Sequence, residues 1–267
     1  MKLSFITPTK YIKEYGTQGD FLLALSHLIK LDEETEYEKA VKESGMKIYL
    51  DNGLFENKTP EPLEDLFKKA KKVGAVCVFA PDLLYDADGT RKLVEEAIKL
   101  RDEKYDELKI AAVVQANNWL EYMTLLEEFN ENPGIDMIGL SILSVPHVYE
   151  PLLNEHNITE ARLNLLQKML TEEGRIKWKP VHLLGLGDSY KDVKYAAQYC
   201  PWVVSNDTSS AFWNAVQGKR INPDGSVEGG KTGVEVDFNT DQLSAETLAL
   251  VQENINNVKE LIYGTKS

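Results

Sequence analysis

Short continuous apolar runs recur along the chain and alternate with longer segments whose apolar residues repeat at helical spacing. Continuous runs of Val, Ile, Leu and Ala indicate strands that are covered on both faces. The predicted strands are 2–7, 47–51, 77–81, 109–115, 136–142, 180–186 and 202–206. The predicted helices are 20–30, 61–73, 89–108, 119–131, 160–173, 191–199, 210–217 and 245–262, and residues 35–44 form an amphipathic stretch.

This alternation predicts an α/β protein with a (β/α)8 barrel rather than an open doubly wound sheet. The eighth unit is the weakest part of the pattern, with residues 233–238 as its strand candidate. Residues 143–157 are expected to form a loop, and the glycine-rich segment 221–233 (INPDGSVEGGKTG) a hairpin or loop inserted after the seventh strand. No linker rich in Pro or Ser divides the chain, so we expect a single domain over residues 1–267.

Polar side chains stand where several predicted strands end. Asp51 ends the run KIYLD, Asp82 follows CVFAP, Gln115 follows IAAVV, and Asp207 follows WVVSN. In a barrel the carboxyl ends of all strands face one opening, where active sites are built. We therefore expect these three carboxylates and one amide to line a single pocket.

Asp51 and Asp207 are the candidate catalytic pair, because one carboxylate can attack carbon while another moves protons. Helix capping is the structural alternative for both, since Asp at a strand-to-helix turn accepts backbone N–H groups. Asp82 is equally compatible with a turn. Gln115 could cap a helix, although an amide aimed into a pocket pairs with both donors and acceptors of a planar ligand.

Other residues of these motifs have weaker indications. Gly139 and Gly185 lie inside predicted strands, where glycine marks a bulge or the close approach of a ligand. His182 stands among leucines and is expected to pack in the core. Lys219 and Arg220, together with Lys231, follow the strand that ends at Asp207 and could hold one or two phosphates.

Composition narrows the class of protein. The chain has 267 residues, 43% hydrophobic and 27% charged, with a formal net charge of -13. That charge repels phosphate backbones at long range and argues against indiscriminate nucleic-acid binding, although a local basic track is compatible with it. No apolar run approaches the length of a membrane span or a signal sequence. Two cysteines without zinc-site spacing indicate free buried thiols in a reducing cytoplasm, and no metal or cofactor motif is present.

The ordered motifs resemble those of the tRNA-guanine transglycosylases. The segment YLDNGLFEN (49–57) is similar to their Asp-Ser-Gly-Gly-Phe-Gln motif, and more similar to the Asp-Asn-Gly-Ala-Phe-Glu form of the DpdA-type 7-deazaguanine DNA transglycosylases of phages and bacteria. The motifs FAPD, VVQ, IGLSI, LLGLG and VSNDTSS follow in the family's order, so that the resemblance covers about residues 47–211.

The resemblance implies a (β/α)8 barrel that exchanges guanine in a nucleic acid for a 7-deazaguanine base without a cofactor. It implies that Asp207 attacks C1′ of the sugar and that Asp51 is the general acid and base. The implied base site contains Asp82 and Gln115 as hydrogen-bonding groups, Phe55 and Leu184 on the two faces of the base, and backbone groups near Gly139, Leu140 and Gly185.

The chain departs from the tRNA enzymes in having no Cys-rich zinc cluster after the strand of Asp207. We therefore expect DNA as the macromolecular substrate and free guanine or a 7-deazaguanine as the exchanged base. The net charge of -13 leaves open a partner protein or a substrate presented as a single strand, and a homodimer is also open. Three alternatives stay open: a small zinc-free tRNA-guanine transglycosylase, a non-catalytic barrel that binds nucleic acid or a deazaguanine, and an unrelated barrel enzyme such as a glycosidase.

Overall fold

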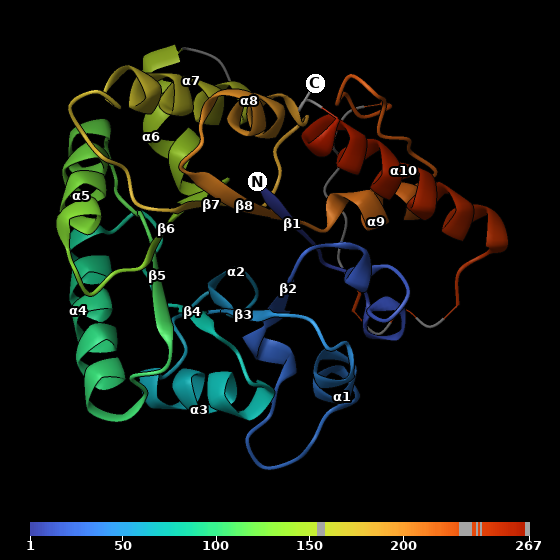
Figure 1. The fold of residues 1–267 in the computed structure, drawn as a ribbon, viewed down its shortest axis with the longest axis horizontal. Helices are drawn as coiled ribbons and strands as arrows, with labels where there is room; N and C mark the ends of the chain where they lie inside the picture. The colour runs from blue at the N-terminus through green and yellow to red at the C-terminus, as the bar shows by residue number, and fades with distance from the viewer. Residues whose placement is uncertain (154–157, 230–236, 239, 241, 265–267) are drawn as a thin grey trace.

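Eight parallel strands form one sheet at the centre of the protein, and helices surround it (Figure 1). The structure is a computed structural model that describes residues 1–153, 158–229, 237–238, 240 and 242–264. The strand order is β1-β8-β7-β6-β5-β4-β3-β2. Strands that follow one another in the chain are therefore paired from β2 to β8, β1 pairs with β8, and β1 and β2 are not paired with each other. The prediction of a (β/α)8 barrel is confirmed.

The strands are β1 (Lys2–Phe5), β2 (Leu22–Leu25), β3 (Ile48–Asp51), β4 (Cys77–Phe79), β5 (Lys109–Val113), β6 (Met137–Ser141), β7 (Val181–Leu184) and β8 (Val203–Thr208). The helices are α1 (Glu36–Glu43), α2 (Leu54–Asn57), α3 (Leu63–Val73), α4 (Ala87–Lys104), α5 (Trp119–Glu131), α6 (Ser144–Leu153), α7 (Ile158–Thr171), α8 (Lys191–Tyr199), α9 (Ser210–Val216) and α10 (Ala245–Tyr263). Short 3₁₀ helices lie at η1 (Thr9–Tyr11), η2 (Gly16–Gln18) and η3 (Ser26–Leu28).

The predicted helix over residues 20–30 is wrong, because this segment forms β2 and the short helix η3. All four residues of β2 are buried, and a short run that is apolar throughout carries no period that separates a strand from a helix. The strand counted as seventh from the sequence is therefore β8, and the glycine-rich segment follows the eighth strand. The other strand candidate, 233–238, lies outside the described residues except at its last two positions.

The expected loop over residues 143–157 is also wrong, since residues Ser144–Leu153 form α6. Pro146 argues against a helix in the sequence. It occupies the first turn, however, where its missing N–H has no intrahelical partner to lose.

The glycine-rich segment does turn back on itself, as expected. Ile221 and Val227 form an antiparallel bridge. Asn254 of α10 fastens the start of this hairpin: its Oδ1 accepts the N–H of Ile221 at 2.8 Å, and its Nδ2 donates to the carbonyl of Lys219 at 3.1 Å. The last helix thus anchors the chain that follows α9.

Side chains close the barrel between β1 and β2, which share no strand ladder. The N–H of Asp20 donates to the carbonyl of Leu3 at 2.7 Å, and the N–H of Leu3 donates back to the Asp20 carboxylate at 2.8 Å. Further along, the Ser4 hydroxyl accepts the N–H of Leu23 at 2.9 Å. The two strands therefore satisfy their facing backbone groups without pairing directly.

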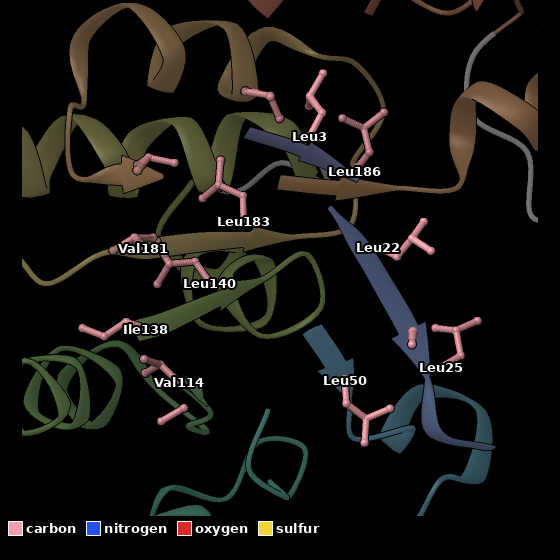
Figure 2. Close-up of a cluster of buried hydrophobic side chains, with 14 of the residues drawn as sticks. Leu3, Leu22, Leu25, Leu50, Val114, Ile138, Leu140, Val181, Leu183 and Leu186 are labelled. Carbon is pink, nitrogen blue, oxygen red and sulfur yellow. The ribbon is translucent and has the colours of Figure 1, made fainter. Parts of the chain in front are cut away.

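Two apolar clusters hold the barrel, one inside it and one between strands and helices. The inner cluster takes alternate residues of several strands: Phe21, Leu23, Cys77, Phe79, Ala111, Val113 and Met137. The residues between them point outward, and Figure 2 shows Ile138, Leu140, Val181 and Leu183 of β6 and β7 in the outer cluster. Both cysteines are buried free thiols, as expected. No helix among the described residues has the length and apolarity to cross a membrane.

A fully buried ion pair ties β6 and β7 to the helices outside them. Arg162 of α7 donates through Nε to the carboxylate of Asp192 at 2.6 Å, and neither side chain is exposed. Three of the remaining guanidinium N–H groups donate to the carbonyls of Leu184 and Gly185, each at 3.0 Å, and of Leu140 at 3.4 Å. One buried cation thus fixes the carboxyl ends of two strands.

Removing the anion of this pair should strongly destabilise the fold. In Asp192→Asn the Arg162 charge stays buried without a counter-charge, and we expect the free energy of unfolding to fall by about 3–5 kcal/mol. Urea denaturation followed by circular dichroism measures the change. The matched control is Glu172→Gln, which breaks the exposed pair with Arg175 and should leave stability nearly unaltered. Equal stability of both variants would show that the buried pair does not hold the barrel.

Candidate active site

Four carboxylates lie near one another at the carboxyl ends of the strands. Asp51 ends β3, Asp82 follows β4, Asp207 lies in β8, and Glu56 lies in α2 directly after β3. The negative charges of Glu56, Asp207 and Asp82 each raise the pKa of Asp51, in that order of importance. The structure therefore brings the predicted pair, Asp51 and Asp207, into one electrostatically coupled site.

Asp207 is almost fully buried and held in one orientation by two donors. Its Oδ1 lies 2.9 Å from Nε2 of His182 and accepts the backbone N–H of Gly185 at 3.1 Å. The other imidazole nitrogen, Nδ1, lies 2.8 Å from the Ser205 hydroxyl. Within the described part of the chain both hydrogen bonds of this carboxylate end on Oδ1, which leaves Oδ2 as the oxygen available to a substrate.

The Gly185 peptide owes its position to the buried arginine. Its carbonyl accepts from Arg162 at 3.0 Å and from Nδ2 of Asn206 at 3.2 Å, while its N–H points to Asp207. Its φ of +69° is in the left-handed region, and an added Cβ would come within 3.1 Å of Ile142. Glycine is therefore required at this turn.

The pKa of Asp51 is raised so far that its carboxyl group is only partly ionised near neutral pH. Burial is the main cause that raises its pKa to about 7, and repulsion by Glu56 is the second. The N–H of Gly53 donates to Oδ2 at 2.9 Å and opposes the shift. A carboxyl group with a pKa near 7 can both donate and accept a proton at neutral pH, which is the requirement for a general acid and base.

Glu56 is a further titratable group of the site, and it belongs to the same YLDNGLFEN motif as Asp51. Burial raises its pKa, and Asp207 adds to this, while Lys58 opposes it. Its Oε2 is buried without a hydrogen bond among the described residues and lies 3.6 Å from Nδ1 of His27. Glu56 thus faces the acid cluster and adds to the negative potential around Asp51.

Asp82 and Gln115 form one polar network with Asn52. The Asp82 carboxylate accepts from Nδ2 of Asn52 at 2.6 Å and from Nε2 of Gln115 at 2.5 Å. Asn52 also donates to the carbonyl of Ala80 at 2.9 Å, and the Gln115 amide oxygen accepts the N–H of Tyr85 at 3.4 Å. Burial raises the pKa of Asp82 to about 6 despite these donors. The network fixes both side chains and uses two of the roughly four acceptor positions of the carboxylate.

The residues expected to enclose a base lie in different environments. Phe55 is 57% exposed in α2, with Nζ of Lys58 4.3 Å from its ring centroid. Leu184 packs against the inner cluster, and a Cβ on Gly139 would come within 2.7 Å of it. Leu140 instead buries its side chain in the outer cluster (Figure 2), and its carbonyl is bonded to Arg162. The side chain of Leu140 therefore does not face the barrel mouth, and its carbonyl is already engaged.

Of the basic residues expected to contact phosphates, the two that the structure describes, Lys219 and Arg220, are engaged by other groups. Arg220 pairs with Glu253 of α10 at 2.7 Å and with Glu228 at 3.6 Å, so its charge is engaged. Lys219 donates to the carbonyl of Gly229 at 3.4 Å. Both follow α9, which separates them from Asp207 along the chain, and Lys231 lies outside the described residues.

His182 and Asn52 are the site residues that sequence reasoning missed. His182 is fully buried, as expected, and packs against Phe79 with 5.2 Å between ring centroids. Its bond to Asp207 depends on the shift in register between β7 and β8, where Val181 pairs with Val203 but His182 with Ser205. A single sequence carries no signal for that pairing. Asn52 could have been found from its place beside Asp51 in a strand-end motif.

The described residues contain no group of three or more His, Cys, Asp or Glu side chains arranged to hold a metal ion. No protein-family model matches the chain, and no curated protein matches it either. The site is therefore described by its own residues: one carboxylate fixed by two hydrogen bonds, one carboxyl group with a pKa of about 7, and one polar network of Asn52, Asp82 and Gln115.

Because its pKa is raised, ionised Asp51 should lower the free energy of unfolding. In the unfolded chain Asp titrates near pH ~3.9, and in the folded protein Asp51 titrates at about 7. Between these values the folded state binds more protons, so the free energy of unfolding falls as pH rises and stays reduced above the folded pKa. Asp51→Asn removes this penalty and keeps an acceptor for the N–H of Gly53.

We expect Asp51→Asn to raise the free energy of unfolding by roughly 2–4 kcal/mol at about pH 8, and to change it little below about pH 4. Denaturation curves at both pH values measure the difference. A gain that is equal at the two pH values would mean that ionisation of Asp51 is not its source.

Proposed function

We propose that this protein is a transglycosylase that exchanges guanine in DNA for a 7-deazaguanine base through a covalent aspartyl-glycosyl intermediate. The observation that carries the proposal is the pairing, in one barrel mouth, of an oriented Asp207 with a partly protonated Asp51. The ordered motifs that resemble guanine transglycosylases support the same chemistry, since they contain both residues.

In the first half of the reaction Oδ2 of Asp207 attacks C1′ of the target nucleotide. The C1′–N9 bond breaks, its electron pair stays on guanine, and Asp51 donates the proton that makes guanine a neutral leaving group. The products are free guanine, a glycosyl ester of Asp207 and the Asp51 carboxylate. His182 and the Gly185 N–H hold Oδ1 throughout, so the attacking oxygen keeps one direction.

The second half reverses these steps with a different base. Asp51 removes the N9 proton of the incoming 7-deazaguanine, N9 attacks C1′, and Asp207 leaves as a carboxylate. The site returns to its starting protonation state, and no electron is gained or lost. One glycosidic bond replaces another, so the exchange needs no cofactor or external energy source.

The polar network supplies the recognition of the base. Asp82 and Gln115 are fixed by each other and by Asn52, and the acceptor positions left on Asp82 suit the N–H groups on the edge of a guanine-like ring. In this proposal Phe55, whose ring is exposed, stacks on one face of the base. The target nucleotide must leave its stack to reach C1′, at a cost of a few kcal/mol that single-stranded DNA largely avoids.

The direct test is incorporation of labelled guanine or 7-cyano-7-deazaguanine into a guanine-containing single-stranded oligonucleotide. Asp207→Asn preserves the Oδ1 acceptor for His182 and Gly185 but removes the nucleophile. We expect it to lower exchange by at least about 10³-fold and to abolish the covalent enzyme–DNA species on denaturing gels. Asp65→Asn, on the outer helix α3, is the matched control and should exchange normally.

Substrates in the same assay separate the alternatives. Label that enters tRNA but not DNA would replace DNA by tRNA in the proposal. Binding of guanine without any exchange would reduce the protein to a binding barrel. A covalent species that persists in Asp207→Asn would remove Asp207 from its role.

The pH dependence of exchange should report the two shifted carboxyl groups. We expect kcat/KM to fall above pH about 7, as Asp51 loses the proton needed by the leaving base, and below pH about 6, as Asp82 is protonated. Glu56→Gln removes a negative neighbour that raises the pKa of Asp51, and should therefore move the alkaline limb to lower pH. An alkaline limb unmoved by this substitution would assign it to a group other than Asp51.

A further inference from the structure

Lys58 is a cation at the barrel mouth that no motif indicated. It directly follows the four-residue helix α2, with a left-handed φ of +61°. This turn directs its side chain back over α2, where Nζ lies 4.3 Å from the ring centroid of Phe55. An ammonium group over an aromatic face is attracted by the ring electrons. The two exposed side chains thus form a paired feature beside the acid cluster.

The charge of Lys58 is not neutralised by an ion pair among the described residues. By contrast, several other cations are engaged by carboxylates: Lys42, Lys68, Lys69, Lys72, Arg91, Arg101, Lys104, Arg162, Arg175 and Arg220. Lys58 also lowers the pKa of Glu56, against the effect of burial. Its positive charge therefore acts on the carboxylates of the site.

A nucleic acid that enters this mouth meets an electrostatic barrier. Asp51, Glu56, Asp82 and Asp207 converge there, and the whole chain carries a formal net charge of -13. Phosphates beside the target nucleotide need a local cation, because they approach within the distance over which salt does not screen these charges. Arg220 near the hairpin does not meet this need, because it is already paired with two glutamates.

We propose that Lys58 binds a phosphodiester next to the target nucleotide of single-stranded DNA, while Phe55, on its other ring face, stacks on the target base. Nζ of Lys58 lies 4.3 Å from the centroid of the Phe55 ring, and Phe55 is 57% exposed, so that ring surface remains for a base. The identity of the target base depends on the proposed function. The phosphate contact requires only that the chain binds a nucleic acid.

Salt dependence of binding isolates this contact. Each phosphate neutralised on a single strand contributes about -0.7 to the slope of log K against log salt concentration. We expect Lys58→Gln to reduce the magnitude of the slope by about 0.7 and to weaken binding of a guanine-containing oligonucleotide roughly threefold or more at low salt. Fluorescence anisotropy over a salt series measures both. Binding of free guanine, which has no phosphate, should be unaltered.

Three variants control the measurement. Lys58→Arg keeps the charge and should restore most of the slope. Lys71→Gln removes an exposed lysine from the outer helix α3 and should match the wild-type protein. Arg220→Gln tests the rival contact near the hairpin and should also match it.

The outcomes separate this inference from the proposed function. A slope unchanged in Lys58→Gln, or one reduced by Arg220→Gln instead, overturns the Lys58 contact even when base exchange proceeds. A slope reduced only in Lys58→Gln supports the contact even when no base is exchanged, in which case the proposed function fails alone. A wild-type protein that binds no oligonucleotide overturns the contact.

Discussion

The buried Arg162–Asp192 pair is the constraint on which the geometry of the site depends. A charge inside the apolar layer between barrel and helices is tolerated only when its donors are satisfied, and here they are satisfied by Asp192 and by carbonyls at the ends of β6 and β7. One of these carbonyls belongs to Gly185, whose N–H holds Asp207. The fold and the orientation of the candidate nucleophile therefore share one interaction, and distortion of the first displaces the second.

The buried carboxyl groups at the barrel mouth lower the stability of the fold when they are ionised. Burial disfavours the charged forms of Asp51, Glu56 and Asp82 and raises the pKa of each. The two aspartates are treated differently by their surroundings. Asp82 receives two amide donors, which oppose the rise of its pKa to about 6, whereas Asp51 receives one backbone N–H and its pKa rises to about 7. Two carboxyl groups with different surroundings can hold different roles at one pH.

The sequence predicted the barrel and the strand-end acids because both depend on local periodicity. Asp51 and Asp207 are 156 positions apart, yet the rule that parallel strands end on one face was enough to bring them together. The sequence pattern could not identify β2, because its apolar run has no period. It could not identify α6 either, because Pro146 is a residue more typical of loops. It also could not pair His182 with Asp207, because that contact depends on a register shift between strands. The position of Lys58 over Phe55 depends on a left-handed turn at Lys58, which a lysine in the sequence does not predict.

The negative charge of the four carboxylates is reduced or offset by the residues around them. Four converging carboxylates would repel both one another and a phosphodiester substrate if all were ionised and bare. Partial protonation of Asp51 reduces its negative charge, and the amide donors of Asn52 and Gln115 stabilise the charge of Asp82. His182 and the Gly185 N–H partly neutralise Asp207 on one oxygen and leave the other free to react. Lys58 offsets the charge of Glu56 at the rim. The proposed DNA substrate therefore meets one cation at the rim, Lys58, and one oxygen of Asp207 that accepts no hydrogen bond from the described residues.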